Sequence, residues 1–155
     1  FSDVLKLVDG RVPLLIEIKL HSHHTYPCLL VDKLLQGYKG SYCIESFNSL
    51  ALFWYRRNRP DVVRGQLSSN LTSPVAEGGY VLSFLVKHLL TNCIGRPDFI
   101  AYCYKDSRNL SFCLNRHLYK TPVFAWTLRT PEAYEKYKKR FDSVIFDSFL
   151  PRRQA

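Results

Sequence analysis

Short segments rich in β-branched residues alternate with amphipathic segments along the chain, and this alternation constrains the fold more than any other feature. The strand-like segments begin near positions 12, 41, 62, 98, 123 and 143, with a helix-like segment between each strand and the next. Strands that alternate with helices form a parallel sheet, because each helix carries the chain back to the same edge of the sheet. The sequence therefore predicts an α/β domain.

Helix start and stop signals support this order of elements. Asn48 is a typical N-cap residue, and the helix that follows it should stop before Pro60. Thr130, with a proline and a glutamate directly after it, is the clearest helix start in the chain. A helix is also expected over residues 1–8, and residues 68–79 should form a loop before a helix that starts at Tyr80. The helix over residues 28–38 should bury one face, formed by Leu30, Leu34, Leu35 and Tyr38.

Two architectures contain a parallel sheet with helical connections. An open doubly wound sheet usually binds its ligand through a glycine-rich first turn, whereas the turns here carry His, Asn, Ser and Lys. A TIM-type (βα)8 barrel fits better, but a closed barrel needs about 250 residues. The 155 residues supply six strands, and position 1 is Phe1 rather than methionine. We therefore expect residues 1–155 to be the C-terminal portion of one barrel domain, about six βα units, with the first two units missing.

Composition excludes several classes of protein. Hydrophobic residues make up 46% of the chain and charged residues 23%, as in an ordinary globular domain. No apolar run reaches the roughly 18 residues of a membrane-spanning helix, and the first residues lack a signal-peptide pattern. We therefore expect a soluble, cytoplasmic protein. The 22 lysines and arginines against 13 acids give a net charge of +9, which favours anionic partners such as phosphates, nucleic acid or acidic lipid headgroups.

The cysteines and histidines form no recognisable metal or redox motif. The five cysteines include no C-x-x-C pair, so we expect reduced residues in the core rather than a zinc site. His21, His23 and His24 directly follow the first predicted strand. They could supply a metal ligand or a proton donor, but a solvated loop is the simpler interpretation.

Polar residues gather at the C-terminal ends of the predicted strands, where barrel enzymes place their chemistry. In Ile16-Glu17-Ile18-Lys19 the alternation of a strand puts Glu17 and Lys19 on one face. A carboxylate inside a barrel is costly unless a cation balances it, so a metal or Lys19 should lie near Glu17. A structural salt bridge, or a register that leaves both charges in solvent, is the alternative. The other strand ends contribute Glu45, Ser46, Gln66, Ser68, Tyr104, Lys105, Trp126, Thr127 and Asp147.

Five short motifs occur in a definite order along the chain. They are Leu15-Ile16-Glu17-Ile18-Lys19, Ile44-Glu45-Ser46-Phe47, Arg64-Gly65-Gln66-Leu67, Phe124-Ala125-Trp126-Thr127 and Phe141-Asp142-Ser143-Val144-Ile145-Phe146-Asp147. Each motif alone is unspecific. In their joint order and spacing, which cover nearly the whole chain, they resemble the C-terminal part of glycerophosphodiester phosphodiesterases.

The resemblance implies a TIM-type barrel that hydrolyses glycerophosphodiesters to glycerol phosphate and an alcohol with a divalent metal, calcium or magnesium. It implies that Glu17 is a metal ligand and that Lys19 is a catalytic cation beside the phosphate. Trp126 would form the glycerol side of the pocket, and Ser46 and Phe47 would help to shape it. The implied partner is a small phosphodiester and not a nucleic acid, and the positive charge is compatible with weak contact with a membrane surface.

The chain also departs from the family pattern. The family's catalytic His-Arg pair, its Glu-x-Asp metal carboxylates and its His-Asp pair lie in an N-terminal part that these 155 residues do not include, and Arg129 stands where the family usually has asparagine. We therefore expect little activity from these residues alone. The alternative is a non-catalytic module that binds anions or a membrane surface and retains half of the barrel. Metal binding would distinguish the two.

Overall fold

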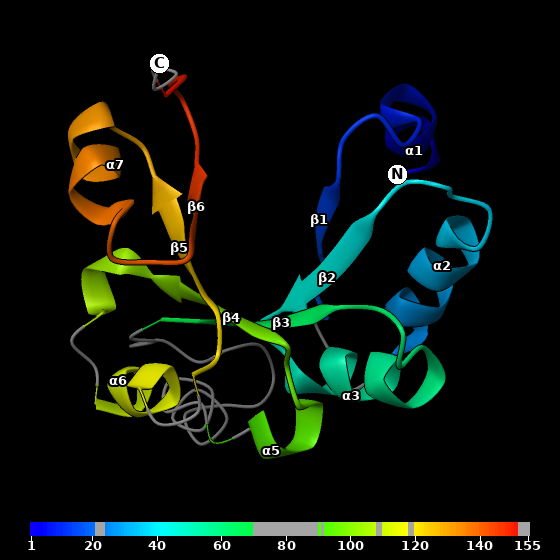
Figure 1. Cartoon of the computed structure of the whole chain (residues 1–155). Coiled ribbons are helices and arrows are strands. Elements are labelled where there is room, and N and C mark those ends of the chain that lie inside the picture. The colour runs from blue at the N-terminus through cyan, green and yellow to red at the C-terminus, as the bar shows by residue number, and fades with distance from the viewer. Residues whose placement is uncertain (21–23, 70–89, 91, 108–109, 118–119, 152–155) are drawn as a thin grey trace.

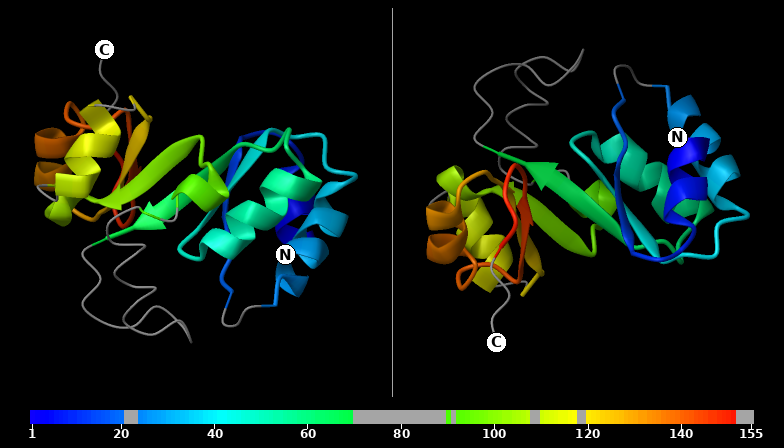
Figure 2. Two further views of the ribbon diagram at one scale, coloured as in Figure 1. Left: turned by 90° about the horizontal axis from the view of Figure 1, so that it is seen from below. Right: turned by 90° about the horizontal axis from the view of Figure 1, so that it is seen from above.

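The computed structural model of the chain describes residues 1–20, 24–69, 90, 92–107, 110–117 and 120–151. These residues form one parallel sheet of six strands, hydrogen-bonded in sequence order. The strands are β1 (Leu14–Glu17), β2 (Tyr42–Ser46), β3 (Arg64–Ser68), β4 (Phe99–Cys103), β5 (Val123–Leu128) and β6 (Ser143–Phe146). Figure 1 shows that the sheet curls into a half barrel, and β1 and β6 lie far apart in that view and in both views of Figure 2.

Helices connect the strands and cover the outer, convex face of the curl (Figure 1). They are α1 (Ser2–Val8), α2 (Tyr26–Leu35), α3 (Ser49–Asn58), α5 (Asn92–Gly95), α6 (Leu110–His117) and α7 (Pro131–Tyr137), with the 3-10 helix η2 (Tyr104–Asp106) after β4. None of the helices in the described ranges combines the length and the apolar character needed to cross a membrane. The expectation of an incomplete TIM-type barrel is confirmed, whereas α5 and η2 were not predicted. Most of the predicted loop over 68–79, and the helix after it, lie outside the described residues.

Two apolar clusters fill the space between the sheet and the helices. In the first, Ile44 of β2 packs with Leu52 and Tyr55 of α3, and all three side chains are fully buried. In the second, Tyr102 of β4 packs against Phe112 of α6, with ring centroids 4.6 Å apart. Burial of side chains of this size supplies roughly 1.5–3 kcal/mol each, so these two clusters hold the helices to the convex face.

The N-caps expected from the sequence are present. The Asn48 side chain accepts a hydrogen bond from the Leu50 amide at 3.0 Å, and the Thr130 hydroxyl accepts one from the Ala133 amide at 3.2 Å. Each bond satisfies a backbone donor at the start of a helix. The two helices therefore begin where the sequence predicts.

The buried face of α2 differs from the predicted one. Leu30 and Leu34 are 43% and 45% exposed, whereas Asp32 and Leu35 are buried. The buried Asp32 carboxylate is stabilised by the Arg59 guanidinium, which lies 2.5 Å away. An apolar pattern cannot reveal a buried acid whose partner follows another helix. The predicted buried face of α2 is therefore wrong for Leu30 and Leu34.

The cysteines are free thiols, but they are not all core residues. Cys28 is fully buried and Cys43 is partly buried, whereas Cys93 is exposed. The expectation of a core position is wrong for Cys93, because this residue lies on α5, a four-residue helix at the surface.

The concave face of the sheet has an apolar cluster of its own, centred on Leu67, Phe99 and Ala101. The Phe99 ring stacks on Phe124 with centroids 4.6 Å apart. A glycine is required at Gly65, because a Cβ atom there would lie 2.1 Å from the Phe99 ring. The aromatic stack therefore occupies the interior of the half barrel below the C-terminal ends of the strands.

Candidate functional site

The charged side chains of Glu17, which ends β1, and of Lys19, two residues later, lie together on the concave side. Ile16 and Ile18 belong to the apolar cluster on the convex face, and alternation along the strand directs Glu17 to the opposite face. The Lys19 ammonium lies 3.7 Å from a Glu17 carboxylate oxygen, and the two side chains are 68% and 35% exposed. The structure therefore brings the two predicted residues together at the solvent-facing C-terminal end of β1.

Glu45 adds a second carboxylate to this region. It is one of the strand-end residues predicted from the sequence, but no role was predicted for it. It is the register partner of Glu17 on the neighbouring strand and is only 6% exposed. Its Oε2 atom is buried and has no hydrogen-bond partner among the described residues. Burial, and next the nearby Glu17 carboxylate, raise the pKa of Glu45 to about 7. A buried acid without a full set of partners is poised to take up a proton or a cation.

The two carboxylates are suitable ligands for a hard divalent cation. Neighbouring strands lie about 4.8 Å apart, so the side chains of Glu17 and Glu45 can reach one ion between them. Calcium and magnesium prefer such oxygen donors, and the unpartnered oxygen of Glu45 is one. Within the described ranges, no group of three or more His, Cys, Asp or Glu side chains could hold a metal. Backbone carbonyls, water or a bound phosphate would have to complete the coordination.

Phe47 and Trp126, two of the predicted pocket residues, meet although β2 and β5 are far apart in the sequence. Their rings pack edge to face with centroids 5.6 Å apart. Both belong to the partly buried rim of the concave cluster, and the buried Trp126 indole nitrogen has no hydrogen-bond partner in the part of the chain that the structure describes. This pair forms an apolar contact between β5 and the residue after β2.

The Ser46 side chain forms hydrogen bonds with backbone groups at the end of β2. Its hydroxyl donates to the Ile18 carbonyl at 2.6 Å and accepts from the Asn48 amide at 3.1 Å. Since Ser46 is 1% exposed, these bonds fix the ends of β1 and β2 relative to each other. Ser46 therefore holds the turn that carries Phe47.

Gln66 of β3 fixes the same turn from the other side. Its fully buried side-chain amide donates to the carbonyls of Ser46 and Phe47 at 3.2 and 3.0 Å, and its oxygen accepts from the Ser49 hydroxyl at 3.0 Å. A buried amide with satisfied donors and acceptor makes the surrounding backbone rigid. The turn after Glu45 is therefore held by bonds from two strands.

Two other strand-end residues, Asp147 and Lys105, make contacts elsewhere. Asp147 forms an exposed ion pair with Arg129 at 3.7 Å, and Lys105 lies in η2 beside a separate cavity. His24 lies on the surface before α2, and His21 and His23 lie outside the described residues. A position at the end of a strand therefore does not by itself bring a residue to the Glu17–Glu45 cluster.

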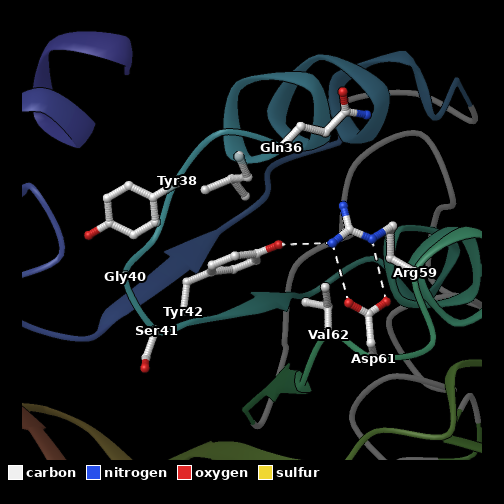
Figure 3. A pocket seen from close by; sticks show the side chains of 9 residues that line it. Gln36, Tyr38, Gly40, Ser41, Tyr42, Arg59, Asp61 and Val62 are labelled. Carbon is white, nitrogen blue, oxygen red and sulfur yellow. Dashed lines mark hydrogen bonds and ion pairs between the residues drawn. The ribbon is translucent and has the colours of Figure 1, made fainter.

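A cavity of about 370 Å³ lies at the opposite, N-terminal end of β2 (Figure 3). Arg59 is one of its lining residues, and the Arg59 guanidinium contacts the Asp61 carboxylate at 3.3 Å and the Tyr42 hydroxyl at 3.5 Å. The same guanidinium holds the buried Asp32. In a barrel this end contributes stability rather than chemistry, and the ion pairs of Arg59 fit a structural role.

Comparison with known proteins identifies the fold. No family model matches the chain, and no curated protein matches it. Among solved structures, it is similar to a Silicibacter pomeroyi protein assigned to the glycerophosphoryl diester phosphodiesterases, with TM-score 0.73 and 19% identity over 94% of this chain and 52% of that one. A glycerophosphodiester phosphodiesterase of Thermotoga maritima gives 0.65 and 21% over 94% and 58%.

A third similar structure is an Oleispira antarctica phosphodiesterase in complex with the product sn-glycerol-3-phosphate, with TM-score 0.66 and 14% identity over 94% of this chain and 56% of that one. The chain thus spans between 52% and 58% of the length of these three proteins. At such low identity the likeness concerns the arrangement of the backbone. Over the part that it spans, the chain has the fold of a glycerophosphodiester phosphodiesterase barrel.

Proposed function

We propose that the chain belongs to the glycerophosphodiester phosphodiesterases and contributes to the hydrolysis of a glycerophosphodiester to glycerol phosphate and an alcohol. The observation that carries the proposal is the cluster of Glu17, Glu45 and Lys19 at the C-terminal edge of the half barrel. Barrel enzymes place their reacting groups at this edge. The fold shared with the phosphodiesterases supports the same substrate class.

In this proposal Glu17 and Glu45 hold a divalent cation, calcium or magnesium. Such an ion, when bound, polarises a phosphoryl oxygen and offsets the charge that develops during phosphoryl transfer. The Lys19 ammonium, which is 68% exposed beside Glu17, would reach a second phosphoryl oxygen and orient the diester. Its charge would stabilise the same developing negative charge.

The apolar pair of Phe47 and Trp126 would contact the carbon atoms of the glycerol. The edge-to-face packing of the two rings forms an aromatic wall between β5 and the residue after β2. This wall would exclude water on one side of the substrate. The product-bound Oleispira antarctica phosphodiesterase supports glycerol phosphate as the ligand class.

The test combines metal binding, product binding and turnover. The chain is titrated with calcium or magnesium by calorimetry, and then with sn-glycerol-3-phosphate. Glu17→Gln and Glu45→Gln should each weaken metal affinity about tenfold or more, because each removes an anionic ligand. Glu132→Gln, an exposed residue on α7, is the matched control and should leave the affinity unchanged.

Hydrolysis of glycerophosphocholine is measured on the same samples. Metal-dependent turnover or product binding that is lost in Glu17→Gln supports the proposal. An unchanged metal titration in Glu17→Gln would contradict the metal-ligand role. A second candidate function, anion binding without catalysis, is favoured by a separate cluster of cations on the convex face.

A further inference from the structure

A cavity of about 670 Å³ is lined by residues of η2, α6 and α7 and by residues that follow them. These elements lie on the convex side of the sheet (Figure 1). Among the described residues that line the cavity, five are basic and none carries a carboxylate. The basic residues are Lys105, Arg116, His117, Lys136 and Arg140. We propose that this cavity binds an anion that carries more than one phosphate group, at a site separate from the carboxylates at the barrel mouth.

Three of the cations of the cavity lie over aromatic rings. The Lys136 ammonium and the Arg140 guanidinium lie 5.4 and 5.6 Å from the centroid of the same ring, that of Tyr137. The Arg116 guanidinium lies 5.7 Å from the centroid of Phe141. Ring faces attract cations, so the rings hold these side chains at the cavity.

Asp106 of η2 follows Lys105 in the chain, and the other basic residues of the cavity lie on or after α6 and α7. The ion pairs of Lys19, Arg59, Arg129 and Lys138 do not include a lysine or arginine of the cavity. Like charges that share one ring repel each other. A bound anion would remove this repulsion and gain several charge-assisted hydrogen bonds at once.

Helix termini account for only part of this arrangement. Arg116 and His117 lie in the last turn of α6, and Lys136 lies in the last turn of α7, where a cation is favoured by the helix dipole. Lys105 belongs to η2 and Arg140 follows α7, so neither of them lies in the last turn of an α-helix. The dipole therefore does not explain why the five side chains converge on one cavity.

The size and chemistry of the cavity define the ligand class. Its volume is in the range of sites for small organic ligands and exceeds what one phosphate group fills. Arginine presents a fork of donors that matches phosphate oxygens. The faces of Tyr137 and Phe141 are already taken by cations, so stacking of a nucleobase is not favoured. Closely spaced phosphate groups, on a soluble molecule or on a lipid headgroup, fit best.

The experiment measures binding of inorganic tripolyphosphate by calorimetry at about 0.15 M salt, which screens nonspecific attraction, with a chelator present. Lys136→Gln combined with Arg140→Gln should weaken binding about tenfold or more, since each change removes a charged donor. Both residues are exposed, so the variant should fold. The matched control, Lys33→Gln combined with Arg57→Gln, removes the same charge from exposed positions on α2 and α3 and should bind like the parent chain.

A second variant and a second probe complete the test. Lys105→Gln combined with Arg116→Gln should also weaken binding, whereas Glu17→Gln should not. Vesicles of phosphatidylcholine with a minor fraction of phosphatidylinositol bisphosphate distinguish a lipid headgroup, if they bind, from a soluble ligand. The proposal is overturned if neither probe binds saturably, if the matched control loses as much affinity as the cavity variants, or if Glu17→Gln abolishes tripolyphosphate binding. None of these outcomes depends on phosphodiesterase activity.

Discussion

Burial of the Glu45 carboxyl should make the metal-free chain less stable as the pH rises. The pKa of Glu45 is about 7 in the folded chain, against an ordinary value of 4.5. Between these two values the folded chain keeps the proton while the unfolded chain releases it. The free energy of unfolding therefore falls as the pH rises through this window. Above pH 7 the contribution of Glu45 to this free energy is at its least favourable and no longer changes.

The size of the effect follows from the same two values. One pH unit between folded and unfolded pKa corresponds to about 1.4 kcal/mol, so Glu45 destabilises the folded chain by roughly 3 kcal/mol at pH 8. Solvent screening changes this little, because the residue is only 6% exposed. Glu45→Gln keeps the shape of the side chain and removes the titration. The variant should therefore gain up to about 3 kcal/mol over the parent chain at pH 8 and nothing at pH 4.5.

Urea unfolding followed by tryptophan fluorescence, between pH 4.5 and 8 with a chelator present, measures this difference. Glu17→Gln should recover a smaller part of the gain, because burial rather than the neighbouring charge is the larger cause of the raised pKa. Glu132→Gln, at an exposed position, should show no pH-dependent gain. A stability difference between Glu45→Gln and the parent chain that is flat with pH, or that grows as the pH falls, would refute the reasoning.

Three further substitutions test the scaffold by urea unfolding or thermal unfolding. Arg59→Gln should cost roughly 3 kcal/mol, because Asp32 is then buried without its partner, and replacing both residues with leucine should recover most of the loss. Gly65→Ala should cost about 1–3 kcal/mol, since its Cβ would overlap the Phe99 ring; a wild-type melting temperature would disprove the close approach. Thr130→Ala should cost about 1 kcal/mol through the lost cap, and Thr130→Ser should restore it.

The order of strands and helices could be predicted because local signals and the global fold agree. Asn48 and Thr130 cap helices in the structure as they do in the sequence pattern. The strand β5 occupies Val123–Leu128, the range that its β-branched and aromatic residues indicate. Short elements were missed, since α5 has four residues and η2 has three, too few for a periodic pattern.

The face of each helix was harder to predict than its position. The leucines of α2 suggested a buried stripe, but two of them point to solvent while Asp32 is buried. What decides the rotation is the ion pair with Arg59, a residue 27 positions away in the sequence. Local periodicity contains no information about such a partner.

The site was predicted in part for a related reason. Glu17 and Lys19 share a face because alternation within one strand is a local property. The role of Glu45 depends on the register between β1 and β2, which places it beside Glu17. Since Glu45 and Ser46 are both polar, the sequence does not show which of them faces the interior. Only the packing of Ile44 against the helices resolves this.

The distribution of charge bears directly on the proposed chemistry. The net charge of +9 suggests a chain that attracts anions everywhere, but the barrel mouth combines two carboxylates with one ammonium. With both acids ionised, this cluster has a net charge of −1 and would repel a phosphodiester. A divalent cation would reverse the sign of the cluster. If the mouth binds glycerol phosphate, binding should therefore depend on metal, whereas tripolyphosphate at the convex cavity, which is lined by cations, should bind equally well in a chelator.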